Sequence, residues 1–298
     1  MKARLIYNPT SGQEIIKKHI ADILDKLEQY GYEASAYQTT AEQDSAKKEA
    51  ARATEAGFNL IIAAGGDGTI NEVVNNYRGQ EFIYLAYGSG NDLARSIKFD
   101  KTVEISKLLD SKKFIEYDAG VVNDRKFCSG FDIGFNADVI KRASDSKLKK
   151  YLGKYIYLLQ GVIGIFMLKK YKAKISWDSD EIDTDSLYLL NVMIQPYEGG
   201  GIKFSQTATG QDGKLHVMVM ENMNILTFIY NYLCLLLKKH DKLKRVKHLT
   251  TNSLTVTTNQ KYFQIDGELI NGKERLNLSC HRKFYKLKRV QNNEKKFK

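Results

Sequence analysis

Glycine residues with a carboxylate between them follow a short apolar run in the segment Asn59–Asn76, and this combination could bind phosphate. The uncharged run Leu60–Ala64 predicts a buried parallel strand. Gly65-Gly66-Asp67-Gly68 comes directly after it, and the apolar residues of Thr69–Asn75 recur at helical spacing. A strand, a glycine turn and a helix in this order leave free N–H groups and the positive end of the helix dipole at the turn, which favours a bound anion.

Asp67 lies within this turn, and its negative charge does not help to hold a phosphate group by affinity alone. A carboxylate beside bound phosphate suits a general base or a metal partner in phosphoryl transfer. A glycine turn could also simply tighten a strand–helix connection, but a second unit argues against this alternative. The apolar strand Phe82–Tyr87 leads into Gly88-Ser89-Gly90-Asn91-Asp92, and a helix begins at Leu93. Two such units predict one phosphate-lined crevice at the carboxyl ends of neighbouring strands.

Neither turn matches a well-known nucleotide-binding motif. The turns read G-x-G-x-x-N and G-x-G-x-x-L, unlike the dinucleotide fingerprint, and no Walker A sequence is present. The nearest approach, Gly267–Glu274, has Glu where Ser or Thr would hold Mg²⁺, and it lies in a region that otherwise predicts strands.

Composition favours a two-domain protein with an anionic partner. The 298 residues are 43% hydrophobic and 27% charged, which is enough for a sizeable core. The three cysteines show no metal-binding spacing and the N-terminal residues lack the apolar run of a signal peptide, so we expect a reducing, cytoplasmic setting. The formal charge of +11 fits either nucleic acid or an anionic membrane surface. Because helix-turn-helix, zinc-finger and RNA-binding aromatic signatures are missing, we expect no nucleic-acid partner.

Two apolar stretches favour the membrane surface. Tyr155–Leu168 and Leu226–Leu237 are both too short to span a bilayer, so we expect peripheral association through shallow insertion and attraction to anionic headgroups. The alternative, for either stretch alone, is a core helix with solvated lysines at its ends. The flanking basic residues are Lys149, Lys150, Lys154, Lys169, Lys170 and Lys172 for the first stretch, and Lys238, Lys239, Lys242, Lys244, Arg245 and Lys247 for the second.

The secondary-structure pattern changes near residue 114. Alternating strand and helix patterns up to about residue 110 predict a parallel α/β sheet, and the later patterns predict a mostly β domain with helical excursions. One helix is expected before Gly31, with Ile16, Ile20, Ile23, Leu24 and Leu27 on one face. The predicted strands are Arg4–Tyr7, Glu33–Gln38, Leu60–Ala64, Phe82–Tyr87, Phe114–Val122, Lys126–Ser129, Ala173–Trp177, Leu187–Ile194, Leu215–Met220, Ser253–Thr258, Tyr262–Ile265 and Leu276–Cys280.

Four motifs in order resemble those of a known family. They are Asn8-Pro9-Thr10-Ser11-Gly12, Gly65-Gly66-Asp67-Gly68-Thr69 with Asn71-Glu72, Gly88-Ser89-Gly90-Asn91-Asp92, and Asp266-Gly267-Glu268. Together they resemble the diacylglycerol kinase catalytic-domain family in its soluble bacterial branch. Sphingosine and ceramide kinases are similar, and NAD kinases share the glycine–aspartate turn. The resemblance covers nearly the whole chain, and it is weaker on which lipid is the substrate.

The resemblance implies two domains: an NAD kinase-like α/β domain over residues 1–118 that binds ATP, to which residues 284–298 return, and a β-sandwich lipid-binding domain over residues 119–283. It implies an ATP-dependent kinase that converts diacylglycerol to phosphatidic acid, with Mg²⁺ as cofactor. A kinase for a sphingoid base or phosphatidylglycerol is the alternative. An NAD kinase fits the GSGND motif and the basic, hydrophobic surface less well, and a non-catalytic lipid or nucleotide sensor would not need Asp67, Asp266 and Glu268 together. A homodimer is a further expectation that does not follow from the resemblance.

The resemblance also implies roles for individual residues. Asp67 would belong to the phosphate and Mg²⁺ network, and Asp266 or Glu268 would be the general base on the lipid hydroxyl. Asp212, with the carbonyl groups of Thr209 and Lys214, would bind a second metal ion. This loop departs from the family pattern at Gln206 and Gln211, and without the resemblance both Asp212-Gly213 and Asp266-Gly267 would be predicted as simple turns. The positions implied for ATP are Asn8, Pro9, Thr10, Ser11, Gly12, Thr39, Gly65, Gly66, Asp67, Gly68, Thr69, Asn71, Glu72, Gly88, Ser89, Asn91 and Asp92.

Overall fold

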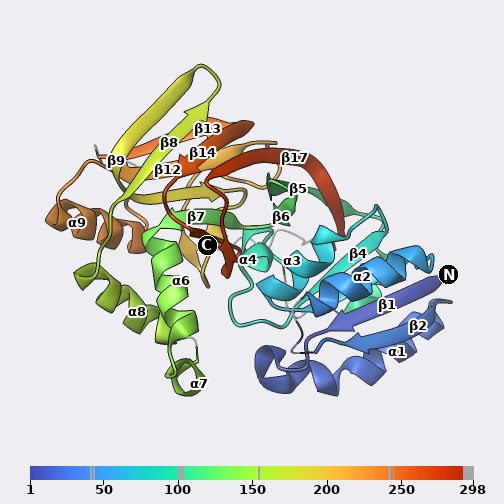
Figure 1. Cartoon of the computed structure of the whole chain (residues 1–298). Coiled ribbons are helices and arrows are strands. Elements are labelled where there is room, and N and C mark those ends of the chain that lie inside the picture. Colours follow the sequence, from blue (N-terminus) through green and yellow to red (C-terminus); the bar gives the residue numbers. More distant parts are fainter. Residues whose placement is uncertain are drawn as a thin grey trace, which may run out of the picture. The chain divides into compact units, whose positions relative to one another are not determined.

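The computed structural model describes residues 1–40, 42, 44–99, 104–153, 155–240, 243 and 245–290 (Figure 1). The chain divides into two compact units. Unit 1 comprises Met1–Tyr117 and Lys283–Lys298, and unit 2 comprises Asp118–Arg282. The chain passes between the units within two strands, β5 (Phe114–Val122) and β17 (Arg275–Lys288).

Unit 1 contains a parallel sheet in the order β2-β1-β3-β4. Its strands are β1 (Lys2–Tyr7), β2 (Glu33–Gln38), β3 (Leu60–Gly65) and β4 (Glu81–Ala86). The last part of β17 extends this sheet beside β4, with Leu287 opposite Phe82 in parallel register. Every residue of β3 is buried, as expected for a parallel strand covered on both faces. The predicted α/β architecture is confirmed.

Helices cover both faces of this sheet (Figure 1). Leu60, Ile62 and Ala64 of β3 pack in one apolar cluster with residues of the first helices and of α5, whereas α2 and α3 pack together separately. The helical segments of unit 1 are η1 (Ser11–Lys18, a 3₁₀ helix), α1 (Ile20–Gln29), α2 (Ser45–Glu55), α3 (Asp67–Asn75), α4 (Asp92–Ser96) and α5 (Ile105–Asp110).

The prediction of a single helix before Gly31 is wrong in one respect, because η1 and α1 are separate segments. The N–H group of His19 donates to the carbonyl group of Ile16 at 2.9 Å, which is the i→i+3 bond of a 3₁₀ turn. The apolar face was predicted correctly, since Ile16, Ile23 and Leu27 are all buried. Helical periodicity therefore identified the buried residues but not the change in winding.

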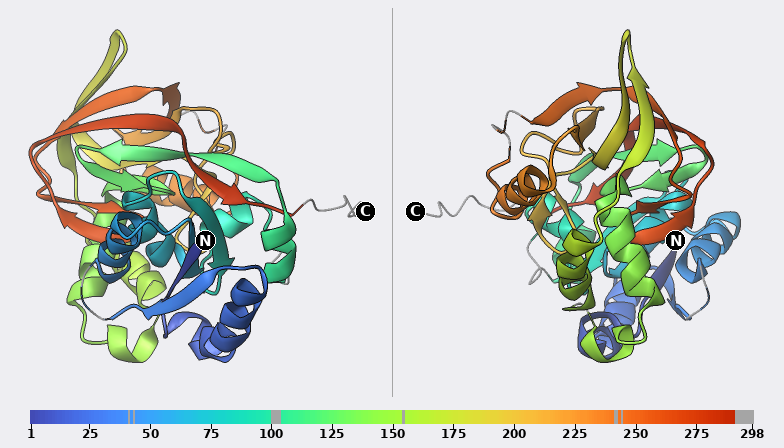
Figure 2. Two further views of the ribbon diagram at one scale, coloured as in Figure 1. Left: turned by 90° about the vertical axis from the view of Figure 1, so that its right-hand side faces the viewer. Right: turned by 60° about the vertical axis from the view of Figure 1, so that its left-hand side comes forward.

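Unit 2 is built mainly from antiparallel strands. The strands β16, β15, β7, β9, β8, β14 and the first part of β17 follow one another, and β12 pairs with both β9 and β13. The long β8–β9 hairpin projects from the unit (Figure 2). Bounds are β6 (Arg125–Phe127), β7 (Gly130–Gly134), β8 (Tyr171–Trp177), β9 (Asp180–Met193), β10 (Tyr197–Glu198), β11 (Ile202–Lys203), β12 (Leu215–Glu221), β13 (Val246–Thr251), β14 (Ser253–Thr258), β15 (Tyr262–Ile265) and β16 (Glu268–Asn271).

Two parts of unit 2 differ from the prediction. Strand β9 begins at Asp180, seven residues before the predicted Leu187, because its polar first half pairs with β8 and alternates between exposed and buried positions. Strand β13 lies in the segment that we expected to be a basic helix flank. Its Lys247 pairs with Glu221 on β12 at 2.6 Å, so this lysine belongs to the sheet.

The helices of unit 2 pack through aromatic side chains. They are α6 (Phe135–Asp145), α7 (Lys149–Leu152), α8 (Tyr155–Phe166) and α9 (Ile225–Leu236). Phe228 of α9 is fully buried and contacts Phe135 and Tyr188, with ring centroids 5.3 and 5.1 Å away. Among the described residues, no helix is long and apolar enough to cross a membrane.

Candidate active site

Three turns lie side by side at the carboxyl ends of β1, β3 and β4 in unit 1. The N–H group of Asn8 donates to the carbonyl group of Ala64 at 3.0 Å. The N–H groups of Tyr87 and Gly88 both donate to the carbonyl group of Gly65, at 3.0 and 3.1 Å. The turns after these strands therefore form one edge, as the two glycine units predicted.

Close packing of the backbone explains two of the glycines. A Cβ atom on Gly88 would lie 2.3 Å from the Cα atom of Gly66, and a Cβ atom on Gly65 would lie 2.4 Å from the Oγ1 atom of Thr69. A larger residue at Gly88 would push two turns apart, and a larger residue at Gly65 would displace the side chain of Thr69 in α3. The N–H groups at the start of α3, which follow Gly66, remain the natural position for a phosphate group.

Asp67 connects two of the turns. Its Oδ1 atom accepts a hydrogen bond from the backbone N–H group of Asp92 at 2.7 Å, at the start of α4. The carboxylate of Asp92 is held in turn by Arg95 at 2.5 Å. Two carboxylates thus lie near this edge, and carboxylate oxygen is the ligand type that Mg²⁺ prefers.

Two further positions implied for ATP serve the backbone in the structure. The Oε2 atom of Glu72 accepts from the N–H groups of Ala46 and Lys47, at 2.8 and 3.3 Å, and so caps the start of α2. The buried side chain of Asn91 donates to the carbonyl group of Gly88 at 2.5 Å. Asn91 has a φ of 51°, so it shapes the turn after β4 from a left-handed conformation.

In unit 2, Asp266 and Gly267 form the two-residue turn of the β15–β16 hairpin, in which Ile265 pairs with Glu268. Their φ angles of 46° and 83° match the left-handed turn that Asp-Gly favours. The Asp266 carboxylate accepts from the N–H groups of Cys128, Ser129 and Gly130, at 2.7, 2.8 and 2.9 Å. Asp266 therefore anchors the hairpin to the connection between β6 and β7.

Glu268 has a different environment from Asp266. Its side chain is 40% exposed and forms an ion pair with Arg125 on β6. The two carboxylates that the sequence could not distinguish are thus separated by geometry: one is occupied by backbone donors, and the other is exposed beside a guanidinium group.

The loop that contains Asp212 is held by polar contacts that the sequence did not predict. His216 contacts the Oδ2 atom of Asp212 at 2.8 Å through Nε2 and the hydroxyl group of Thr207 at 3.0 Å through Nδ1. The N–H group of Gly213 donates to Asp118 at 2.7 Å. In the described part of the chain, no group of three or more His, Cys, Asp or Glu side chains could hold a metal ion. Asp212 with backbone carbonyls still fits Mg²⁺ in ligand type, so the role of Asp212, Thr209 and Lys214 remains a prediction.

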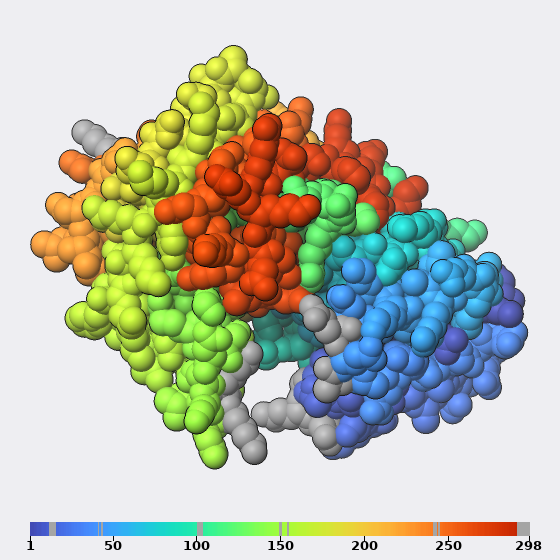
Figure 3. Space-filling model, in the orientation of Figure 1, coloured from blue at the N-terminus to red at the C-terminus, as the bar shows by residue number. Residues whose placement is uncertain are grey.

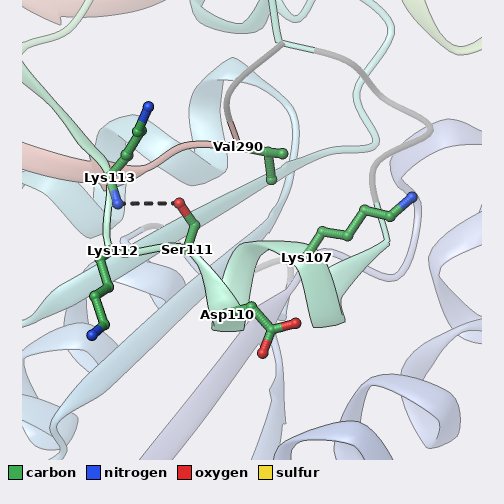
Figure 4. A pocket seen from close by; sticks show the side chains of 6 residues that line it. All are labelled: Lys107, Asp110, Ser111, Lys112, Lys113 and Val290. Atoms are coloured by element: carbon green, nitrogen blue, oxygen red, sulfur yellow. Dashed lines mark hydrogen bonds between the residues drawn. The ribbon is translucent and has the colours of Figure 1, made fainter. Parts of the chain in front are cut away.

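A hollow of about 400 Å³ lies away from all these residues, in unit 1 (Figure 4). None of the residues implied for ATP, metal or catalysis lines it. Its lining residues are Lys107, Asp110, Ser111, Lys112, Lys113 and Val290.

Two buried carboxyl groups near the Asp266 hairpin escaped the sequence analysis. Asp132 on β7 is fully buried and Glu198 on β10 is 6% exposed. Burial raises the pKa of Asp132 from 3.8 to about 6, against hydrogen bonds from Asn191, Gln264 and Asn136 that lower it. Burial, and then the charges of Asp132 and Asp266, raise the pKa of Glu198 well above its usual 4.5. Asp132 lies in a strand-like segment, FDIGF, and only the three-dimensional structure brings Glu198 beside it.

Two models of known domain families match this chain, one in each half. The model of the diacylglycerol kinase catalytic domain matches residues 2–122. The model of the YegS C-terminal NAD kinase beta sandwich-like domain matches residues 129–280, which identifies unit 2 as a β-sandwich-like domain. Both halves therefore have the architecture of a lipid kinase.

Relatives with similar sequences extend over nearly the whole chain. The diacylglycerol kinase of Bacillus subtilis strain 168 is 34% identical, over 90% of this chain and 89% of the relative. That of Staphylococcus epidermidis strain RP62A is 31% identical, over 98% of this chain and 94% of the relative. The chain belongs to the diacylglycerol kinase family, and it is a kinase that acts on a lipid alcohol with ATP as phosphate donor. The predicted family is confirmed.

A solved structure shows the same fold. The crystal structure of a diacylglycerol kinase from Bacillus anthracis strain Sterne superposes with a TM-score of 0.73 and 22% identity. It covers 98% of this chain and 97% of that chain.

The Asp212 loop leads to a first testable prediction. If Asp212 holds Mg²⁺, added Mg²⁺ should raise the melting temperature of the parent but not that of Asp212→Ala, because the variant lacks the carboxylate. His216→Ala removes only the histidine contact, so it should keep the Mg²⁺ response. Calorimetry with a metal chelator and with Mg²⁺ raised to about 10⁻³ M and above, the range in which weak oxygen-ligand sites fill, measures the shift. The same Mg²⁺ response in the parent and in Asp212→Ala would show that the loop is only a turn.

The buried carboxyl pair leads to a second prediction, for stability against pH. Both groups bind protons more tightly when folded, so the stability that they contribute is present at low pH and is lost as pH rises from about 4 through about 6 and above. Glu198→Gln removes one of the two groups. The melting temperature of the parent should therefore fall more steeply than that of Glu198→Gln between pH 5 and 8. Parallel melting curves would mean that the pair does not titrate in this way.

Proposed function

We propose that this protein transfers the γ-phosphate of ATP to the hydroxyl group of diacylglycerol, giving phosphatidic acid. The observation that carries the proposal is similarity along almost the full length to proteins named diacylglycerol kinase, with both motif regions included. In unit 1 the hydrogen-bonded turns supply a phosphate-binding edge, and in unit 2 a hairpin presents Glu268.

The edge in unit 1 is suited to hold the phosphate groups of ATP. Gly65, Gly66 and Gly88 allow the turns and α3 to pack closely, and the start of α3 offers N–H groups to negative oxygen atoms. Asp67 and Asp92 would hold Mg²⁺ through carboxylate oxygens. When bound, Mg²⁺ supplies neutralisation of the charge on the transferring phosphate.

Glu268 is the general base that the geometry favours. A primary hydroxyl group is a poor nucleophile at neutral pH, so a carboxylate must accept its proton as the oxygen attacks the γ-phosphorus atom and ADP leaves. Both oxygens of Asp266 already accept backbone hydrogen bonds, so its role is to hold the turn. The ion pair with Arg125 orients Glu268.

Helices α8 and α9 of unit 2 are the proposed contact with an anionic membrane surface. Besides the side chains that they bury in the core, they expose large apolar side chains, among them Leu158 at 70%, Phe166 at 85% and Leu226 at 74%. The side chains of α8 lie on the surface in the space-filling view (Figure 3). A soluble surface rarely carries this much apolar area without a partner, and membrane association of the kinase would bring it to its lipid substrate. The alternative is that a second copy of the chain covers the same helices in a homodimer.

Basic residues beside these helices provide the electrostatic attraction. Lys169, Lys170, Lys238, Lys239 and Arg245 are exposed next to the helix ends. Lys172 and Lys247 pair with Asp185 and Glu221, and they contribute less. The side chains of Lys149 and Lys150, and all of Lys154, Lys242 and Lys244, lie outside what the structure describes.

The choice of base can be tested by kinetics. Glu268→Gln should lower kcat on diacylglycerol by about 10²–10⁴-fold, the usual size of general-base catalysis, with little change in melting temperature. Asp266→Ala should lower the melting temperature as well, because it leaves three backbone N–H groups without their acceptor. A normal kcat in Glu268→Gln, together with a large loss of kcat in Asp266→Ala at unchanged melting temperature, would show that Asp266 is the general base and Glu268 is not.

The membrane surface can be tested by vesicle sedimentation. The triple variant Lys238→Gln/Lys239→Gln/Arg245→Gln should bind anionic vesicles more weakly than the parent, because each basic residue near the surface contributes about 1 kcal/mol. Binding by the parent should also fall as salt rises.

The matched control removes the same charge elsewhere on unit 2. Lys174→Gln/Lys261→Gln/Arg275→Gln changes exposed residues on and beside its strands and should leave vesicle binding close to that of the parent. Equal binding of all three proteins to anionic and neutral vesicles would favour a homodimer surface, which analytical ultracentrifugation would then detect.

A further inference from the structure

The side chain of Gln264 joins the catalytic hairpin to the buried carboxyl pair of unit 2. Gln264 lies on β15 and is 1% exposed. Its Oε1 atom accepts a hydrogen bond from the N–H group of Gly267 at 2.7 Å. Its Nε2 atom donates to the Oδ2 atom of Asp132 and, at 2.8 Å, to the Oε1 atom of Glu198. One amide group therefore contacts the turn and both acids.

Asp132 is surrounded by donors. Its Oδ1 atom accepts from the side-chain amide groups of Asn136 at 2.9 Å and Asn191 at 3.0 Å, and its Oδ2 atom accepts from Gln264. Asn191 and Gln264 are its direct neighbours on the adjacent strands β9 and β15. Three amide donors aimed at one carboxyl group favour its ionised form. Of the two acids, Asp132 is therefore the one that is ionised.

Glu198 has the opposite environment. It accepts a hydrogen bond from Gln264, and it lies against Gly130, where a Cβ atom would come within 2.7 Å of its Oε2 atom. The negative charges that act on it are those of Asp132 and Asp266, and both raise its pKa. A buried acid that faces two carboxylates keeps its proton, so the proton of the pair belongs to Glu198.

We propose that Glu198, as a neutral acid, Asp132, as a carboxylate, and Gln264 together form a support that fixes the turn before Glu268. They are positioning residues for the reaction proposed above, on which this inference rests, and they act through Glu268 without touching the substrate. The turn is held at two points. Asp266 accepts hydrogen bonds from three backbone N–H groups, and Gln264 accepts a hydrogen bond from the N–H group of Gly267. Misplacement of a catalytic group by about 1 Å can cost on the order of a hundredfold in rate.

Swapping each acid for its amide tests where the proton lies. In Asp132→Asn, a new NH₂ group must face at least one of the three amide donors, so the variant should melt well below the parent and lose turnover. In Glu198→Gln, a neutral NH₂ group replaces the neutral hydroxyl group of the acid, and the Oε1 atom can still accept from Gln264. The loss of turnover should therefore be at least about tenfold smaller than in Asp132→Asn, as expected for the conservative variant of a neutral acid. Equal losses, or a larger loss in Glu198→Gln, would overturn this placement of the proton.

Gln264→Met tests the support itself, and Gln260→Met is the matched control. Gln260 is also buried in unit 2 and also bridges a backbone N–H group, of Gly134, and a carboxylate, of Asp138, but it acts near the start of β15 and not at the turn before Glu268. Gln264→Met should lower kcat on diacylglycerol by about tenfold to a hundredfold with KM for ATP unchanged. Gln260→Met should destabilise the protein without this selective loss of kcat.

Hydrogen exchange separates this inference from the proposed function. Peptides that contain Gly267 and Glu268 should exchange faster in Gln264→Met than in the parent and in Gln260→Met, whatever substrate the enzyme uses. If Gln264→Met does not fold, the two amide variants still decide the question through the same peptides, with fast exchange in Asp132→Asn only. Unchanged exchange in the folded Gln264→Met, or the same exchange in both amide variants, would overturn the support. A parent without lipid kinase activity would contradict the proposed function alone.

Discussion

Three backbone N–H groups converge on the carboxylate of Asp266, and the candidate site of unit 2 depends on this contact. The contact fixes a left-handed turn, the turn fixes the start of β16, and β16 begins with Glu268. A carboxylate that is committed to backbone donors cannot also serve easily as a base, and for this reason we propose Glu268 for that role. Asp67 has a similar structural task in unit 1, where it accepts from the N–H group of Asp92 and joins two turns.

Other polar residues of the candidate site also hold the backbone or a neighbouring side chain in place. Glu72 caps α2, Asn91 shapes the turn after β4, and His216 holds Asp212. Hydrogen bonds to backbone groups are local and strongly directional, so they fix the path of the chain to within a fraction of an ångström. A kinase needs this precision because most of its rate enhancement comes from positioning and from electrostatic stabilisation of the transferring phosphate.

Sequence patterns predicted what depends on local chemistry. The glycine spacing around Asp67 and after β4 correctly indicated that these turns meet at one edge of the sheet, because only glycine tolerates the close approach of Gly66 and Gly88. Apolar runs identified β3, β5, β14 and β15 with correct or nearly correct bounds. Strand β16 was missed because it is short and partly polar, although its partner β15 is only two residues away. Strand β13 was missed because its partner β12 lies far away in the sequence. The Asp132–Glu198 pair was missed for the same reason, because nothing in the sequence shows that Gln264 links strands β7 and β10.

Phosphoryl transfer from ATP to diacylglycerol is tested most directly by a labelled-ATP assay. The purified protein would be mixed with γ-labelled ATP, Mg²⁺ and vesicles that contain diacylglycerol, a sphingoid base or phosphatidylglycerol, with NAD as a soluble acceptor in parallel. A diacylglycerol kinase should place the label in phosphatidic acid at a rate well above that for every other acceptor. Faster labelling of the sphingoid base, of phosphatidylglycerol or of NAD, or no labelling of diacylglycerol at all, would contradict the claim.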